Sequence, residues 1–271
     1  MRLRIVSVAA IVVALTATSA GAHDYWLEFQ PLAPAVDQAL ALSLWVGEDF
    51  VAEAEKAMQR DRTVSLRHLH RGGDEDLRAV GREGAAPLLE VPLKTPGGHL
   101  LSLERDPSHI VLRARKFNRY LEHEGLSSIL DERRRTHQRL RRARERYTRY
   151  LKAFVQVGDA ADGVSTRPLG HRLELVPDRD LAALRPGDRL GVRLLFEGAP
   201  VAGAQVEAFV KRSRGGPATG QAAITDGDGR IEVAIGEAGA WLVRTVHMQR
   251  CEACDDADWE SFWTSYSFAV R

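Results

Sequence analysis

Metal binding is the chemistry that the sequence favours first, and His23 is the residue that carries it. Residues 1–22 have a basic start, a short apolar run over residues 5–17 and a small-residue ending at Ala22. These three parts predict a cleavable secretory signal. After cleavage, His23 would hold a free α-amino group beside its imidazole, and both groups can lose a proton to become nitrogen ligands near neutral pH at modest cost. Asp24 adds a carboxylate oxygen, and this donor set suits Ni(II), Co(II) or Cu(II).

A second group of potential ligands lies far along the sequence, over residues 246–258. His247 comes at the end of an apolar, strand-like run, and we expect it to complete a nitrogen-rich site with His23 if the fold brings them together. Cys251 and Cys254 follow with a spacing that suits a tight disulfide, a thiolate metal site or a redox pair. An oxidising compartment favours the disulfide. A zinc ribbon is excluded, because it needs a second cysteine pair.

The remaining histidines form no complete site in the sequence. His68 and His70 share one face of a predicted strand at a spacing that can hold a metal ion, but this spacing also arises by chance. Four others have no donor nearby and are expected to be structural or exposed: His99, His109, His123 and His171. Motifs for nucleophilic catalysis, phosphate binding and dinucleotide binding are missing, so we do not expect an enzyme.

The overall charge is balanced, with 38 Lys and Arg against 37 Asp and Glu. This balance gives no overall positive field to attract nucleic acid. One segment differs, because residues 133–152 hold nine arginines and one lysine against the single acid Glu145. A solvated helix face is the expected explanation, with contact to anionic lipid headgroups or to an acidic partner left open. No segment after residue 22 is long and apolar enough to predict a membrane span.

The pattern of apolar residues divides the mature chain into three regions. Residues 23–115 carry short runs broken by Gly, Pro and Asp turns, which predicts an N-terminal β domain. Residues 171–271 carry about seven such runs, a number typical of an immunoglobulin-like or Greek-key sandwich. Residues 116–157 show helical spacing, with one helix expected to stop at Gly125 and another to begin near Ser127. We therefore expect a mainly β fold, with two antiparallel β-sandwich domains joined by a central helical segment.

Four segments of the mature chain carry a family resemblance. They are residues 23–28 (HDYWLE), 117–126 (FNRYLEHEGL), 144–150 (RERYTRY) and 239–263, which includes His247. Together they resemble a bacterial family of exported proteins with a domain of unknown function, DUF4198. Its members are commonly described as periplasmic components of cobalt or nickel uptake, so the resemblance implies a periplasmic metal-handling protein. The cysteine pair lies in a variable loop and takes no role from the resemblance.

Two functions from different classes follow from these observations. The first is a periplasmic accessory for nickel or cobalt uptake, which would bind the metal at His23, Asp24 and His247 and pass it to an inner-membrane transporter. Copper and zinc are the other metals that this site would accept.

The second is a β-sandwich binding or adhesion module for a partner protein or glycan. Its contact residues would be aromatic, although core packing explains the same residues: Tyr25, Trp26, Trp259, Phe262 and Trp263. A copper oxygenase that uses His23 shares the ligand chemistry of the first function, but nothing in the sequence points to a polysaccharide-binding face.

Overall fold

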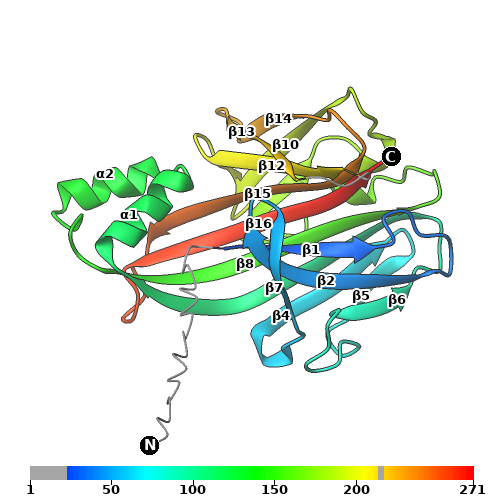
Figure 1. The fold of residues 1–271 in the computed structure, drawn as a ribbon, viewed down its shortest axis with the longest axis horizontal. Helices are drawn as coiled ribbons and strands as arrows, with labels where there is room; N and C mark the ends of the chain where they lie inside the picture. The colour runs from blue at the N-terminus through cyan, green and yellow to red at the C-terminus, as the bar shows by residue number, and fades with distance from the viewer. Residues whose placement is uncertain (1–22, 213–216) are drawn as a thin grey trace, which may run out of the picture.

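The computed structural model describes residues 23–212 and 217–271, and it is built mainly from β-strands (Figure 1). The predicted signal peptide over residues 1–22 lies outside the described residues and stays a prediction. Within the described part of the chain, no helix has the length and apolar character needed to cross a bilayer.

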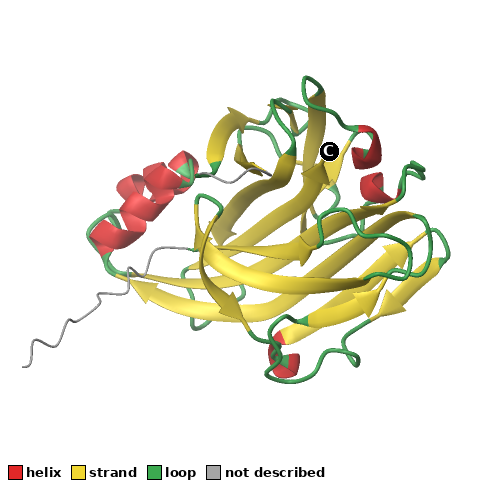
Figure 2. Cartoon of the chain, turned by 45° about the vertical axis from the view of Figure 1, so that its right-hand side comes forward, coloured by secondary structure: helices red, strands yellow, loops and turns green. Residues whose placement is uncertain are grey.

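An eight-stranded sheet runs through the whole molecule and forms its middle layer (Figure 2). In spatial order its strands are β13 (Thr219–Ile224), β12 (Gln205–Arg212), β15 (Gly239–Arg250), β16 (Trp259–Val270), β8 (Ala143–Val157), β7 (Gly97–Leu112), β4 (Thr63–His70) and β5 (Gly73–Asp76). β16 and β8 pair in parallel, from Trp259 opposite Glu145 to Phe268 opposite Phe154. β8 pairs with β7 of the predicted N-terminal domain on its other side, so the two predicted β domains share one sheet.

Two four-stranded sheets cover opposite faces of the large sheet. The first consists of β1 (Asp24–Gln30), β2 (Ala39–Glu48), β3 (Val51–Lys56) and β6 (Leu89–Pro92). The second consists of β9 (Leu173–Pro177), β10 (Arg189–Phe196), β11 (Ala199–Pro200) and β14 (Arg230–Ala234). Leu151 of β8 packs in the first core and its neighbour Tyr150 in the second. Because successive strand residues point to opposite faces, the two small sheets sandwich the large one, and the predicted mainly β fold is confirmed.

The helical insertion lies at one end of the molecule (Figure 1). It consists of α1 (Ala114–His123) and α2 (Ser127–Arg135), whose apolar residues pack against Trp259 and Trp263 of β16. Gly125 separates them with φ 68°, a left-handed conformation that glycine adopts without strain. This is the helix stop that the sequence predicts. Three single turns of 3₁₀-helix complete the structure: Arg60–Arg62, Val164–Thr166 and Leu181–Ala183.

The prediction that helix continues to residue 157 is wrong, because residues 143–157 form strand β8. Tyr147, Leu151 and Phe154 do recur at helical spacing. However, β8 is buried on both faces from Tyr150 to Val155, and a strand buried on both faces loses the alternation of a half-exposed one. Its arginines therefore lie on a strand, and Arg149 stacks over the ring of Tyr25 at 3.9 Å.

The aromatic residues that could have formed a binding face pack mainly inside the protein. Three of them are 0% exposed and one is 5% exposed: Trp26, Trp259, Phe262 and Trp263. Tyr25 is half-buried. These rings therefore stabilise the cores between the layers and form no exposed aromatic surface.

Candidate metal centre

The predicted ligand His23 lies immediately before β1, beside two carboxylates. Its Nε2 is 3.6 Å from Glu48 Oε1 and 3.6 Å from Glu53 Oε2. Glu48 ends β2 and Glu53 lies on β3, which pairs with β2. His23 therefore has two acidic neighbours that the sequence analysis does not name.

Asp24 belongs to a buried charge cluster. The residue is 5% exposed. Its Oδ2 forms an ion pair with Arg244, whose Nε lies 3.2 Å away. The same guanidinium contacts Glu124 and Glu207. Burial, together with the nearby carboxylates of Glu124 and Glu207, raises the pKa of Asp24 to about 7 against the opposing effect of Arg244. Asp24 is therefore one of three carboxylates that share the guanidinium of Arg244.

His247 lies on the opposite face of the large sheet from Asp24. Its ring centroid is 4.5 Å from that of Phe196 on β10, and burial lowers its pKa. Arg244, three residues earlier on β15, faces Asp24 on β1. Residues three apart on a strand point to opposite faces. The structure therefore does not bring His247 together with His23 and Asp24, and the predicted three-residue site is not assembled.

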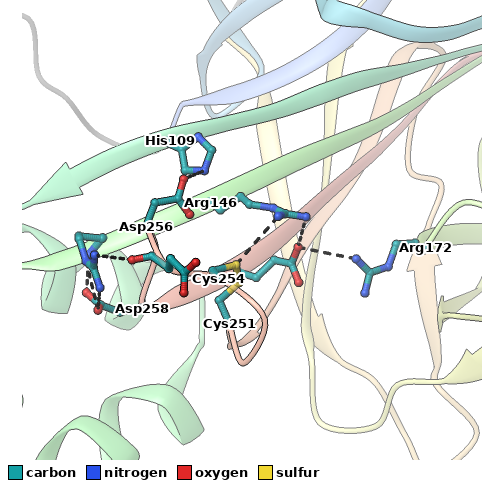
Figure 3. Close-up of a disulfide and its surroundings, with 10 residues drawn as sticks. His109, Arg146, Arg172, Cys251, Cys254, Asp256 and Asp258 are labelled. Carbon is teal, nitrogen blue, oxygen red and sulfur yellow. Dashed lines mark hydrogen bonds and ion pairs between the residues drawn. A yellow bond between two sulfur atoms is a disulfide. The ribbon is translucent and has the colours of Figure 1, made fainter.

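Cys251 and Cys254 form a disulfide in the loop between β15 and β16 (Figure 3). Arg146 Nη1 lies 4.0 Å from Cys254 Sγ. The far end of the loop is fixed by Asp258, which accepts from the backbone N–H of Arg144 at 2.9 Å and from its guanidinium at 2.8 Å. Of the alternatives for these cysteines, the structure has the disulfide.

A compact group of potential ligands forms where β5, β4 and β7 meet at the edge of the large sheet. One nitrogen each of His68 and His70 and one oxygen of Glu75 lie within 4.8 Å of one another. His68 and His70 are two residues apart on β4 and therefore share a face. Glu75 lies opposite His68 on β5, and His99 lies opposite His70 on β7. Pairing of three strands thus assembles three imidazoles and a carboxylate.

The rings of this cluster stack against one another, and Glu75 faces two of them. The ring centroids are 4.9 Å apart for His68 and His70, 5.0 Å for His68 and His99, and 5.7 Å for His70 and His99. Glu75 Oε2 is 3.5 Å from His68 Nδ1, and Glu75 Oε1 is 3.6 Å from His70 Nε2. His68 and His99 are buried while Glu75 is exposed, so the cluster has one side open to solvent.

A chain of hydrogen bonds determines which nitrogen of His68 is free to bind a cation. His99 Nε2 lies 2.9 Å from the carbonyl oxygen of Thr95, which can only accept, so His99 donates there. In a neutral ring, His99 Nδ1 must then accept from His68 Nε2, 2.8 Å away. This leaves His68 Nδ1 without a proton, with its lone pair beside the carboxylate of Glu75. Two acceptors at this separation are stabilised by a cation or proton between them.

His70 must rearrange before its Nε2, the nitrogen that faces Glu75, can bind a metal ion. Its Nδ1 accepts from the backbone N–H of Gly72 at 3.1 Å, which places the proton of a neutral ring on Nε2. Binding a metal ion through Nε2 therefore requires a change of tautomer and loss of the bond to Gly72. His99 is not counted among the ligands. It is hydrogen-bonded to His68, and a hydrogen bond of this kind orients a histidine that binds a metal ion.

Burial and the neighbouring rings favour the neutral forms of His68 and His99. Burial, together with the nearby rings of His99 and His70, lowers the pKa of His68 to about 4 against the opposing effect of Glu75. Burial also lowers the pKa of His99. Neutral imidazole is the form that binds metal ions, so His68 is in a binding-competent state near neutral pH.

The spacing of His68 and His70 is visible in the sequence, whereas Glu75 and His99 are not predicted as parts of this cluster. Glu75 had a usable signal, because the tight turn at Arg71 and Gly72 places His70 opposite Gly73 and hence His68 opposite Glu75. His99 had none, since its position depends on the register between β4 and β7, which are separated by a long connection.

A family model described as "Domain of unknown function (DUF4198)" matches residues 20–249, most of the chain. This protein belongs to the DUF4198 family. The family resemblance carried by the four sequence segments is therefore confirmed. The match itself assigns no metal and no transport role to the DUF4198 fold.

Comparison of this DUF4198 protein with curated proteins finds no match. Among solved structures it is similar to one titled "Crystal structure of tetra-tandem repeat in extending region of large adhesion protein", with 10% identity and a TM-score of 0.22. The match covers 92% of this chain and 49% of that one, so the chain spans about half the length of that structure. At this TM-score the similarity carries no argument about function.

Proposed function

We propose that this DUF4198 protein binds a divalent transition metal ion at the edge of its large sheet. His68 Nδ1 and a carboxylate oxygen of Glu75 are the first ligands, and His70 joins them after its change of tautomer. The observation that carries the proposal is the approach of these three ligand atoms to within 4.8 Å of one another. The free lone pair of His68 beside Glu75 supports it.

The donor set narrows the class of metal. Two imidazole nitrogens and one carboxylate oxygen suit Ni(II), Co(II), Zn(II) or Cu(II), whereas Mg(II) and Ca(II) prefer oxygen ligands alone. Three protein ligands leave coordination positions for water or for a donor from another molecule. Such a site suits a protein that accepts a metal ion and passes it on, and nickel or cobalt is our proposed cargo.

The predicted signal peptide supports a periplasmic location for this activity. There the protein would serve as an accessory to an inner-membrane metal transporter, which is the partner we propose. A second metal position is favoured by the two carboxylates at 3.6 Å from His23 Nε2, since the α-amino group of a processed chain would add a nitrogen ligand beside them.

Calorimetric titration of the processed protein with Ni(II), Co(II), Cu(II) and Zn(II) tests the proposal. We expect His68→Gln and Glu75→Gln each to weaken binding of the preferred metal by about 100-fold, because each removes a ligand. His109→Gln is the matched control, since His109 is half-exposed and pairs with Asp256 in another part of the protein. A form with two extra residues before His23 separates the two positions.

The outcomes are distinct. Binding that is weakened by His68→Gln but not by the N-terminal extension supports the site on β4. Binding that is lost only in the extended form moves the metal to His23. If none of the four metals binds the processed protein, the proposal of a metal-binding function is wrong.

A further inference from the structure

The connection between α2 and β8 forms an arginine-rich loop at the helical end of the molecule. We call residues 134–142 the arginine loop; their sequence is RRTHQRLRR. Leu140 is 91% exposed, the largest exposure among the large apolar residues of the described chain. Arg135, Arg139, Arg141 and Arg142 are exposed around it. A leucine thus projects into solvent from a ring of positive charge.

A buried arginine holds this loop in its conformation. The side chain of Arg133 is 1% exposed, and its Nη2 donates to the carbonyl oxygen of Gln138 at 2.9 Å and to that of Arg141 at 2.8 Å. Asn118 of α1 donates to the carbonyl oxygen of Arg139 at 3.0 Å. Because the backbone carbonyls are bound from inside the protein, the side chains between residues 139 and 142 point outward from a fixed turn.

The charge of the loop is largely uncompensated. Arg134 pairs with Asp131, but the four arginines around Leu140 form no ion pair with any residue in 23–212 or 217–271. No acidic residue occurs between Arg133 and Arg142. Three more exposed arginines lie in or next to the neighbouring helix α1: Arg113, which immediately precedes it, Arg115 and Arg119.

We propose that the arginine loop docks on an anionic lipid bilayer, with Leu140 inserted among the headgroups. Arginine side chains pair with lipid phosphates while their apolar stems reach toward the acyl boundary. A lipid bilayer presents both kinds of partner at its surface, because its phosphates can pair with the arginines and its apolar chains can contact the leucine. The fixed turn favours docking, because little conformational freedom is lost when the loop meets the bilayer. This inference does not depend on the metal site.

Co-sedimentation of the full chain with vesicles tests the proposal. The probe is vesicles of phosphatidylglycerol mixed with phosphatidylcholine, and the reference is phosphatidylcholine alone. We expect binding to the mixed vesicles only, and binding that falls as salt is added. Replacing Arg139, Arg141 and Arg142 together by glutamine should weaken partitioning by about 100-fold, at about fivefold per arginine near an anionic surface. Leu140→Ser should weaken it by about tenfold.

A matched control removes the same charge elsewhere, by changing Arg82, Arg167 and Arg193 to glutamine. These side chains are exposed on other parts of the molecule, and we expect this variant to bind as the unaltered protein does. Equal losses in the two triple variants would mean that the overall charge drives binding, which overturns the docking site. Absence of binding to either vesicle also overturns the proposal and would leave an acidic protein as the partner of the loop. All substitutions are on the surface, so circular dichroism should be unchanged.

Discussion

Glu145 is a buried carboxyl group with hydroxyl partners and no ion pair among the described residues. It is 3% exposed and accepts hydrogen bonds from Tyr120 and Ser261. Burial raises its pKa from 4.5 to about 7, even though these hydrogen bonds lower it. The folded protein therefore keeps a proton that the unfolded chain releases between pH 4.5 and 7. Because the folded state binds more protons in this window, stability falls as the pH rises through it.

We predict that Glu145→Gln removes this pH dependence. Glutamine keeps an acceptor oxygen for the two hydroxyl groups but cannot ionise. Between pH 4.5 and 7 the unaltered protein should lose about 3 kcal/mol relative to the variant, and the difference should stay constant above pH 7. Urea unfolding at several pH values measures this difference, with the exposed residue change Glu90→Gln as the control. Parallel curves for all three proteins would contradict the prediction.

At the scale of elements, the helix stop at Gly125 depends on both its backbone and its surroundings. A Cβ added there would lie 2.7 Å from the Cβ of Gln205, whose side chain donates to the carbonyl oxygen of His123 at 3.0 Å. Gly158 has almost the same φ, 69°, but a Cβ there would meet nothing within 4 Å. The two positions therefore separate backbone strain from steric overlap.

We predict that Gly158→Ala lowers the free energy of unfolding by about 1 kcal/mol, from backbone strain alone. Gly125→Ala should lower it by about 2 to 3 kcal/mol, since the overlap with Gln205 adds to the same strain. Chemical denaturation of both variants checks the difference. An equal loss of unfolding free energy in the two variants would show that overlap with Gln205 of β12 adds nothing to the backbone strain.

The elements that the sequence predicts correctly are those with local signals. The helix stop lies at Gly125 as predicted, and residues 171–271 form strands separated by turns, as their alternation of apolar runs and turn residues predicts. β8 has no such signal, because its two faces are buried by the two small sheets and its neighbour β16 comes far later in the sequence. The proposed metal-binding cluster divides in the same way. His68 and His70 are visible on one strand, but His99 reaches them only through the pairing of two distant strands.

At the scale of the whole molecule, the shared sheet couples the two halves. β8 and β16 are paired over ten consecutive residue pairs, and both small sheets rest on the sheet that contains this seam. We predict that the protein unfolds in a single transition. Tryptophan fluorescence and far-ultraviolet circular dichroism should give coincident denaturation curves. Two separated transitions would instead show that the predicted N-terminal and C-terminal domains are independent.

The long strands also set the distance between the two proposed sites. β7 runs from the metal cluster at His99 to Leu112, next to the start of α1 and the helical end of the molecule. That length of strand corresponds to a separation on the order of 40 Å. If the arginine loop lies on a bilayer, the metal cluster would therefore lie at the far end of the long strands.

The central position of β16 has a consequence for how the protein is made. A ribosome that has produced only the first 250 residues has supplied β15 and β8 but not the strand that lies between them. Until β16 follows, the nascent chain holds two separate half-sheets, each with an open edge of the kind that promotes aggregation. A premature stop codon just before residue 259 would therefore do more than shorten the protein slightly. It would leave two half-sheets in one chain with no strand to join them, and we expect proteases to degrade such a product.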